Sequence, residues 1–179
     1  MSKRSRRLLT KNKLKFVLSF LLRFNLLAIP LYLVIYSNFS FQPLQTLIAQ
    51  IITGLLKAQN YNIIQNNDMI ITNINDITYN IEVSWDSTGW KSLYALFALV
   101  MAVPASNIKS KLRFLSVGLP AIFMLNLIRV LTTILIAINY GFQYFDVVHT
   151  LLWREGLIIA VVLLWYFWLA REKHNIRQK

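Results

Sequence analysis

Three polar side chains of this sequence, Ser87, Arg129 and His149, have the types that acyl transfer requires. A serine hydroxyl attacks a carbonyl carbon when a base accepts its proton, and a neutral histidine can be that base. An arginine guanidinium can stabilise the oxyanion of the tetrahedral intermediate that forms. Because such a set is defined by geometry and not by order along the chain, its existence depends on the elements that carry the three residues.

Further polar residues flank these three within one or two helical turns and are candidates for supporting the site. They are Asp86, Thr88 and Lys91 around Ser87, Asn126 before Arg129, and Arg154 after His149.

The composition is that of a membrane protein. The chain has 179 residues, of which 56% are hydrophobic and 15% charged, and its mean hydropathy is +0.51. This is too apolar for a soluble domain of that length. The net charge is +12, but the basic residues gather at the two ends and in one internal segment between apolar runs. Such clusters set membrane topology and argue against nucleic-acid binding.

The count of potential ligand residues excludes several kinds of site. The chain has no cysteine, so disulfides, thiolate metal sites and a cysteine nucleophile are excluded. Two histidines argue against a histidine-based metal cluster. We therefore expect no metal and no other cofactor.

Four apolar runs predict transmembrane helices, because the hydrocarbon core is about 30 Å thick and a helix rises about 1.5 Å per residue. These runs are residues 16–36, 88–104, 114–139 and 149–170. The basic clusters belong on the cytoplasmic side, and they lie in residues 1–15, 105–113 and 171–179. We therefore predict an all-α multi-pass membrane protein in which residues 1–179 form a single membrane domain with both termini inside the cell.

Two segments between the first and second spans are expected outside the cell. Residues 41–58 repeat apolar side chains at helical spacing and place polar ones such as Gln45 and Thr53 on the opposite face. This predicts an amphipathic helix on the outer interface, since a fifth span would put the internal basic segment outside. Residues 60–87 are rich in Asn and contain alternating runs, which predict a small extracellular β-hairpin.

With this topology the three candidate residues approach the outer membrane face. Ser87 lies where the hairpin meets the second span, and His149 opens the fourth span. Arg129 lies about fifteen residues above the inner end of the third span, which is about 22 Å at helical rise. An ionisable group inside a membrane costs about 2.5–3.5 kcal/mol, so this convergence favours a function.

Each residue also has an ordinary structural interpretation. Ser87, Thr88 or Asp86 could cap the following helix. Arg129 could pair with a carbonyl group or with Glu155. His149 could lie near headgroups and Lys91 could extend toward water.

The motifs Ser-Thr-Gly at 87–89 and Asn-x-x-Arg at 126–129, followed by His149, resemble the exosortase/archaeosortase family of multi-pass membrane transpeptidases. The resemblance covers about half the chain, and Ser87 stands where the family has its catalytic cysteine. It implies a cysteine-protease-like transpeptidase with a serine nucleophile and an active site facing outside. Its substrates would be membrane proteins with a C-terminal sorting signal made of a short motif, a transmembrane helix and a basic tail. Cleavage near the outer membrane face would be followed by transfer to a lipid or another acceptor.

Two other functions remain open. A catalytically silent member of this family could act as a membrane binding or assembly factor. A small transporter is a third possibility, but the sequence contains no inverted repeat that would support one.

Overall fold

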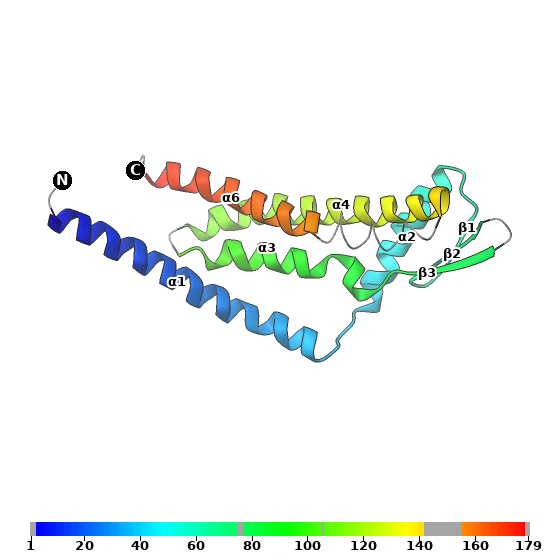
Figure 1. Ribbon diagram of the computed structural model, residues 1–179, viewed down its shortest axis with the longest axis horizontal. Helices are drawn as coiled ribbons and strands as arrows, with labels where there is room; N and C mark the ends of the chain where they lie inside the picture. The colour runs from blue at the N-terminus through cyan, green and yellow to red at the C-terminus, as the bar shows by residue number, and fades with distance from the viewer. Residues whose placement is uncertain (1–2, 75–76, 105, 142–154, 178–179) are drawn as a thin grey trace.

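The computed structural model describes residues 3–74, 77–104, 106–141 and 155–177, and within them it is mostly helical with one small sheet (Figure 1). The helices are α1 (Lys3–Tyr36), α2 (Gln42–Ala58), α3 (Trp90–Ala102), α4 (Ile108–Tyr140) and α6 (Glu155–Arg177). The strands are β1 (Ile63–Asn66), β2 (Met69–Ile74) and β3 (Ile77–Glu82), and a short 3-10 helix, η1, covers Trp85–Thr88. The start of α1 and the end of α6 lie at one end of the molecule, and the sheet lies at the other (Figure 1).

Two of the described helices are long and apolar enough to cross a membrane. They are Lys13–Tyr36 within α1 and Ile108–Tyr140, which is α4. Helix α3 is apolar but has 13 residues, about 20 Å at helical rise, so it is shorter than the hydrocarbon core. The predicted span 149–170 begins outside the described residues, and its remainder lies in α6. The helical membrane architecture is confirmed, while the count of four spans stays a prediction.

The long helices pack around α3. One core joins α3, α4 and α6 through buried apolar side chains that include Leu96, Ile122 and Val161. Helix α1 is open to its surroundings, since none of its most apolar window is buried, whereas 44% of that of α4 is. Its link to α3 includes the Tyr94 hydroxyl, which donates to the Leu27 carbonyl oxygen at 2.6 Å.

The predicted loop 105–113 is helical from residue 108 onward, because α4 begins at Ile108. The Asn107 side chain accepts a hydrogen bond from Lys109 N at 3.2 Å and so caps the new helix. Lys111 lies on the second turn, buried, and its Nζ donates to the carbonyl oxygens of Met101 and Val103 at 2.9 and 2.6 Å. This basic residue therefore closes the C-terminal end of α3, where carbonyl groups lack helical partners.

The β structure is a three-stranded antiparallel sheet of order β1-β2-β3, one strand more than the predicted hairpin. The β1–β2 turn contains Asn67 at φ +52°, a conformation that asparagine tolerates better than most residues. One face of the sheet buries Ile63, Ile70 and Ile81 against α2. Alternation along each strand produces this single apolar face.

Helix α2 forms over the predicted range, but its buried face differs from the prediction. Gln45 and Thr53 are buried, whereas Leu47 is 46% exposed. The reason is that α2 packs between the sheet and α4 (Figure 1), and this packing selects the buried face. The Gln45 amide fits there because its Nε2 donates to the Val83 carbonyl oxygen at 3.0 Å, just after β3.

Candidate active site around Ser87

Ser87 lies in η1, the tight turn that joins the sheet to α3. Its backbone N–H donates to the Ser84 carbonyl oxygen at 3.0 Å, and the two serine hydroxyl oxygens are hydrogen-bonded at 2.9 Å. The Ser87 side chain is partly exposed. A hydroxyl held at the surface of a tight turn is accessible to a peptide, as a nucleophile must be.

The helix-cap interpretation of Asp86, Ser87 and Thr88 is wrong. The N-cap residue of α3 is Gly89, and no described side chain caps that helix end. The Thr88 side chain is fully buried, and its hydroxyl donates back to the Trp85 carbonyl oxygen at 2.7 Å. Thr88 therefore stabilises η1 and not the start of α3.

Asn126 connects this turn to α4. Its side chain is 1% exposed, and its Nδ2 donates to the Ser87 carbonyl oxygen at 3.0 Å. Its Oδ1 accepts a hydrogen bond from Arg129 Nη1 at 3.4 Å. Residues three apart lie on one face of a helix, so the Asn-x-x-Arg spacing presents both side chains to η1.

Arg129 is buried in the same region, at 6% exposure. Its own carbonyl oxygen accepts a hydrogen bond from the Thr133 hydroxyl at 2.9 Å, one turn along α4. The structure thus brings Ser87, Asn126 and Arg129 into one hydrogen-bonded chain, although the first lies far from the other two in sequence.

Asp86 and Lys91 form a separate pair at the surface. Lys91 Nζ lies 2.8 Å from Asp86 Oδ1, and both side chains are substantially exposed. Exposed ion pairs contribute little to stability. Lys91 Nζ also lies 6.0 Å from the centre of the Trp90 ring. The pair borders the buried chain, and the Asp86 carboxylate interacts electrostatically with Arg129.

The remaining predicted site residues, His149 and Arg154, lie outside the described residues, and their roles stay predictions. Across the ranges 3–74, 77–104, 106–141 and 155–177, no group of three His, Asp or Glu residues could hold a metal ion. Among the described residues, hydrogen bonds join the backbone of Ser87 to the buried Arg129 guanidinium. A hydroxyl and a cation are group types that acyl transfer uses.

A comparison with protein-family models identifies the family of this chain. A family model described as Transmembrane exosortase (Exosortase_EpsH) matches residues 8–169. This range includes the hydrogen-bonded residues Ser87, Asn126 and Arg129, and also His149. The chain belongs to the transmembrane exosortase family. No curated protein and no solved structure gave a significant match. Family membership supports a membrane protein with a general exosortase-like role.

Sequence reasoning missed several residues beside Ser87 in this member of the exosortase family. The rings of Trp85 and Trp90 stack at 5.2 Å, and Phe39 meets Trp85 edge-on at 6.3 Å. These rings border a hollow of about 210 Å³ next to η1. The signal that could have found it is the pair of tryptophans that brackets Ser87 in the segment SWDSTGW.

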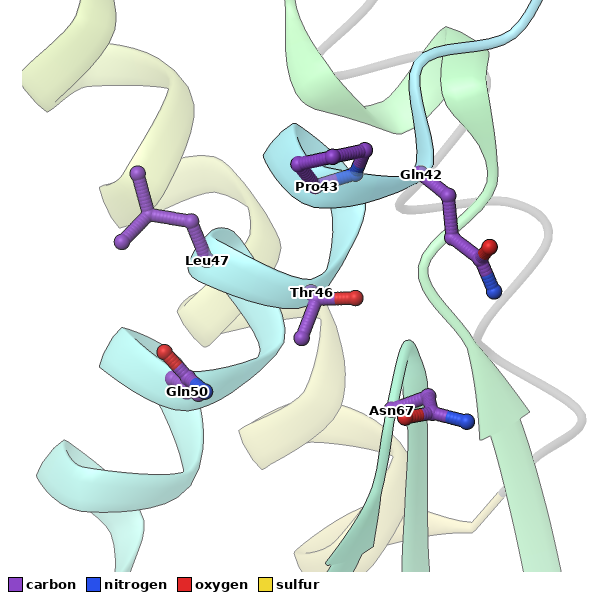
Figure 2. Close-up of a pocket in the computed structure, with 6 residues that line it drawn as sticks. All are labelled: Gln42, Pro43, Thr46, Leu47, Gln50 and Asn67. Carbon is purple, nitrogen blue, oxygen red and sulfur yellow. The ribbon is translucent and has the colours of Figure 1, made fainter.

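A second, larger hollow of about 570 Å³ lies between the start of α2 and the β1–β2 turn (Figure 2). Figure 2 shows Gln42 and Thr46 on the side of α2 that faces Asn67. Amides and a hydroxyl can hold a ligand by hydrogen bonds. Among the described residues, none that lines this hollow titrates near neutral pH.

Proposed function

We propose that this protein is a membrane-embedded exosortase-like transpeptidase that uses Ser87 as its nucleophile. The observation that supports the proposal is the hydrogen-bond chain from Arg129 through Asn126 to the Ser87 carbonyl oxygen. This hydrogen-bond chain links a buried guanidinium to the backbone of Ser87, whose side chain is partly exposed. A hydroxyl nucleophile and a fixed cation are the groups that acyl transfer uses. The exosortase family supplies the reaction class.

The proposed reaction has two steps. The Ser87 oxygen attacks the carbonyl carbon of a substrate peptide bond while its proton moves to His149, and Arg129 stabilises the oxyanion. The C–N bond then breaks, the leaving amine takes the proton from His149, and an ester to Ser87 remains. A hydroxyl or amine of the acceptor attacks this ester, giving its proton to His149, which returns it to the Ser87 oxygen as the C–O bond breaks.

The proposed substrates are surface proteins with a C-terminal sorting signal that includes a transmembrane helix and a basic tail. A lipid is the first candidate for the acceptor. Cleavage near the outer face of the cell membrane agrees with the basic clusters, which put residues 60–87 outside. The exposed apolar window of α1 and the apolar α4 support a site held at membrane level.

A serine-reactive phosphonate probe, applied to membranes that contain the full chain, tests the nucleophile. Labelling should disappear in Ser87→Ala and persist in Ser84→Ala, the matched control whose hydroxyl is the hydrogen-bond partner of Ser87. Ser87→Cys should retain processing of a sorted substrate, because a thiolate is the stronger nucleophile. Undiminished labelling and processing in Ser87→Ala would contradict the proposal.

A second candidate is a catalytically silent family member that binds transmembrane partners. Two observations favour it: serine replaces the family cysteine, and the Ser87 hydroxyl is engaged by Ser84 at 2.9 Å. This candidate predicts that Ser87→Ala keeps its association with the same membrane proteins and their normal assembly. Loss of assembly in Ser87→Ala would favour the enzyme.

A further inference from the structure

A hollow of about 210 Å³ lies directly beside the turn that carries Ser87. It is formed where the end of α1 and the connection to α2 meet η1 and the start of α3. Its lining comprises Val34, Ile35, Asn38, Phe39, Ser40, Trp85, Asp86, Trp90 and Lys91. A lined space of this size next to a candidate nucleophile is a candidate substrate subsite.

The aromatic walls are held by contacts on both sides. Trp85 and Trp90 stack nearly parallel, with an interplanar angle of 18°. Phe39 approaches Trp85 at 85°, edge to face. Both arrangements are favourable for aromatic rings, so the walls are preorganised to receive another flat or apolar group.

The end of α1 explains why Phe39 reaches this position. Asn38 adopts φ +50°, in the left-handed region, and Phe39 N donates to the Val34 carbonyl oxygen at 3.3 Å. A residue in this conformation ends a helix and reverses the chain across its last turn. The reversal carries the Phe39 ring, which is 52% exposed, to the rim of the hollow.

The hollow also has polar lining residues, Asn38, Ser40, Asp86 and Lys91, whose charges sum to zero. Asp86 and Lys91 neutralise each other at 2.8 Å. The indole N–H groups of Trp85 and Trp90 are buried and have no hydrogen-bond partner in the described part of the chain. Because these N–H groups have no exposed surface, a ligand in the hollow meets the rings and not their donors.

We infer that this hollow is a subsite for one large apolar side chain of the substrate peptide, next to the bond that Ser87 attacks. The identity of the ligand, a substrate peptide, rests on the proposed function. The hollow itself does not depend on it. Trp85 and Asp86 immediately precede Ser87 in η1, and an extended peptide advances about 3.3 Å per residue. A side chain seated in the hollow therefore belongs to a residue close to the scissile bond. Phenylalanine, which matches the aromatic walls, is the probe of choice.

The test measures binding of three labelled peptides, identical except for a central Phe, Ala or Lys, to the full chain in nanodiscs. Fluorescence anisotropy should show the Phe peptide binding about tenfold or more tighter than the Ala and Lys peptides, as expected for burial of a large apolar side chain. Equal binding of the three peptides would overturn the inference.

Two variants separate this subsite from general affinity for the membrane. Phe39→Ala should remove most of the preference for Phe. Phe167→Ala, which lies on α6 and is exposed to a similar degree at 60%, should leave the preference intact. If both variants weaken all three peptides equally, the aromatic rings act as interfacial anchors and the inference is wrong.

A third variant separates the inference from the proposed function. Ser87→Ala should keep the preference for the Phe peptide, because its side chain does not line the hollow. Failure of the wild-type chain to process any substrate would contradict the proposed function while the Phe preference persisted. Loss of the preference in Ser87→Ala would count against a separate subsite.

Discussion

Gly89 lies so close to Asn126 that any side chain at position 89 would clash with the Asn126 amide. A Cβ atom built on Gly89 would lie 2.6 Å from Asn126 Cγ and 2.8 Å from its Oδ1. Gly89 also has φ +75°, in the left-handed region that other L-residues rarely adopt. The glycine of the Ser-Thr-Gly motif therefore lets the amide of α4 reach the carbonyl of Ser87.

Gly89→Ala should destabilise the protein by about 1–3 kcal/mol from backbone strain alone. It should also displace Asn126 and lower any activity that depends on Ser87. Thermal unfolding of the purified chain in detergent measures the first effect. Gly54→Ala is the matched control, because a Cβ there meets nothing within 4 Å and alanine favours a helix by up to about 1 kcal/mol. Equal melting temperatures for the two variants would contradict this account.

Asn126→Asp should separate the two hydrogen bonds of that side chain. An aspartate keeps an acceptor for Arg129 but cannot donate to the Ser87 carbonyl oxygen when ionised. We expect the variant to accumulate in the membrane and to process substrate at least about tenfold more slowly, since an unsatisfied buried acceptor costs about 1–3 kcal/mol. Asn139→Ala, an exposed amide on the same helix, is the control and should process normally.

Arg129→Lys should lose most processing while the protein still accumulates in the membrane. A guanidinium offers planar paired donors, whereas an ammonium is a compact point charge that cannot reproduce them. The measurement is cleavage of a sorted substrate, normalised to the amount of protein in the membrane. Retained processing would reduce Arg129 to a structural role.

His149→Ala should be about as damaging as Ser87→Ala, and the double variant hardly worse than either. Residues that act as one catalytic unit are not additive, because removing one member already disables the others. Rates of substrate processing for the two single variants and the double variant test this. Additive losses would mean that the imidazole does not assist the Ser87 hydroxyl.

Single cysteines introduced into this cysteine-free chain should report the topology. Asn66→Cys, at the exposed β1–β2 turn, should react with an impermeant thiol reagent in intact cells. Ile108→Cys, 50% exposed at the start of α4, should react only after the membrane is opened. The basic clusters predict this difference, and the reverse pattern would show that the site faces the cytoplasm.

Composition and periodicity alone predicted the helical membrane class and the range of α2. The motifs around Ser87 and Arg129 carried a resemblance to the family that the family match confirms. These properties are local, since apolar runs and helical spacing are written within single segments. Strand β1 was missed because its four residues, Ile63–Asn66, show no alternation of their own and become a strand by pairing with β2. The start of α4 at Ile108 was missed because basic residues were taken as a loop, whereas Asn107 caps a helix there.

Tertiary structure decided which side chains meet. The pattern of α2 could not reveal that Gln45 lies inward, because its burial depends on the Val83 carbonyl oxygen, 38 residues away. In the same way, Ser87 and Asn126 come together only when η1 packs against α4 through the gap at Gly89. A sequence specifies the periodicity of each element, but the burial of a polar group depends on the partner that satisfies it, and that partner is supplied by the fold.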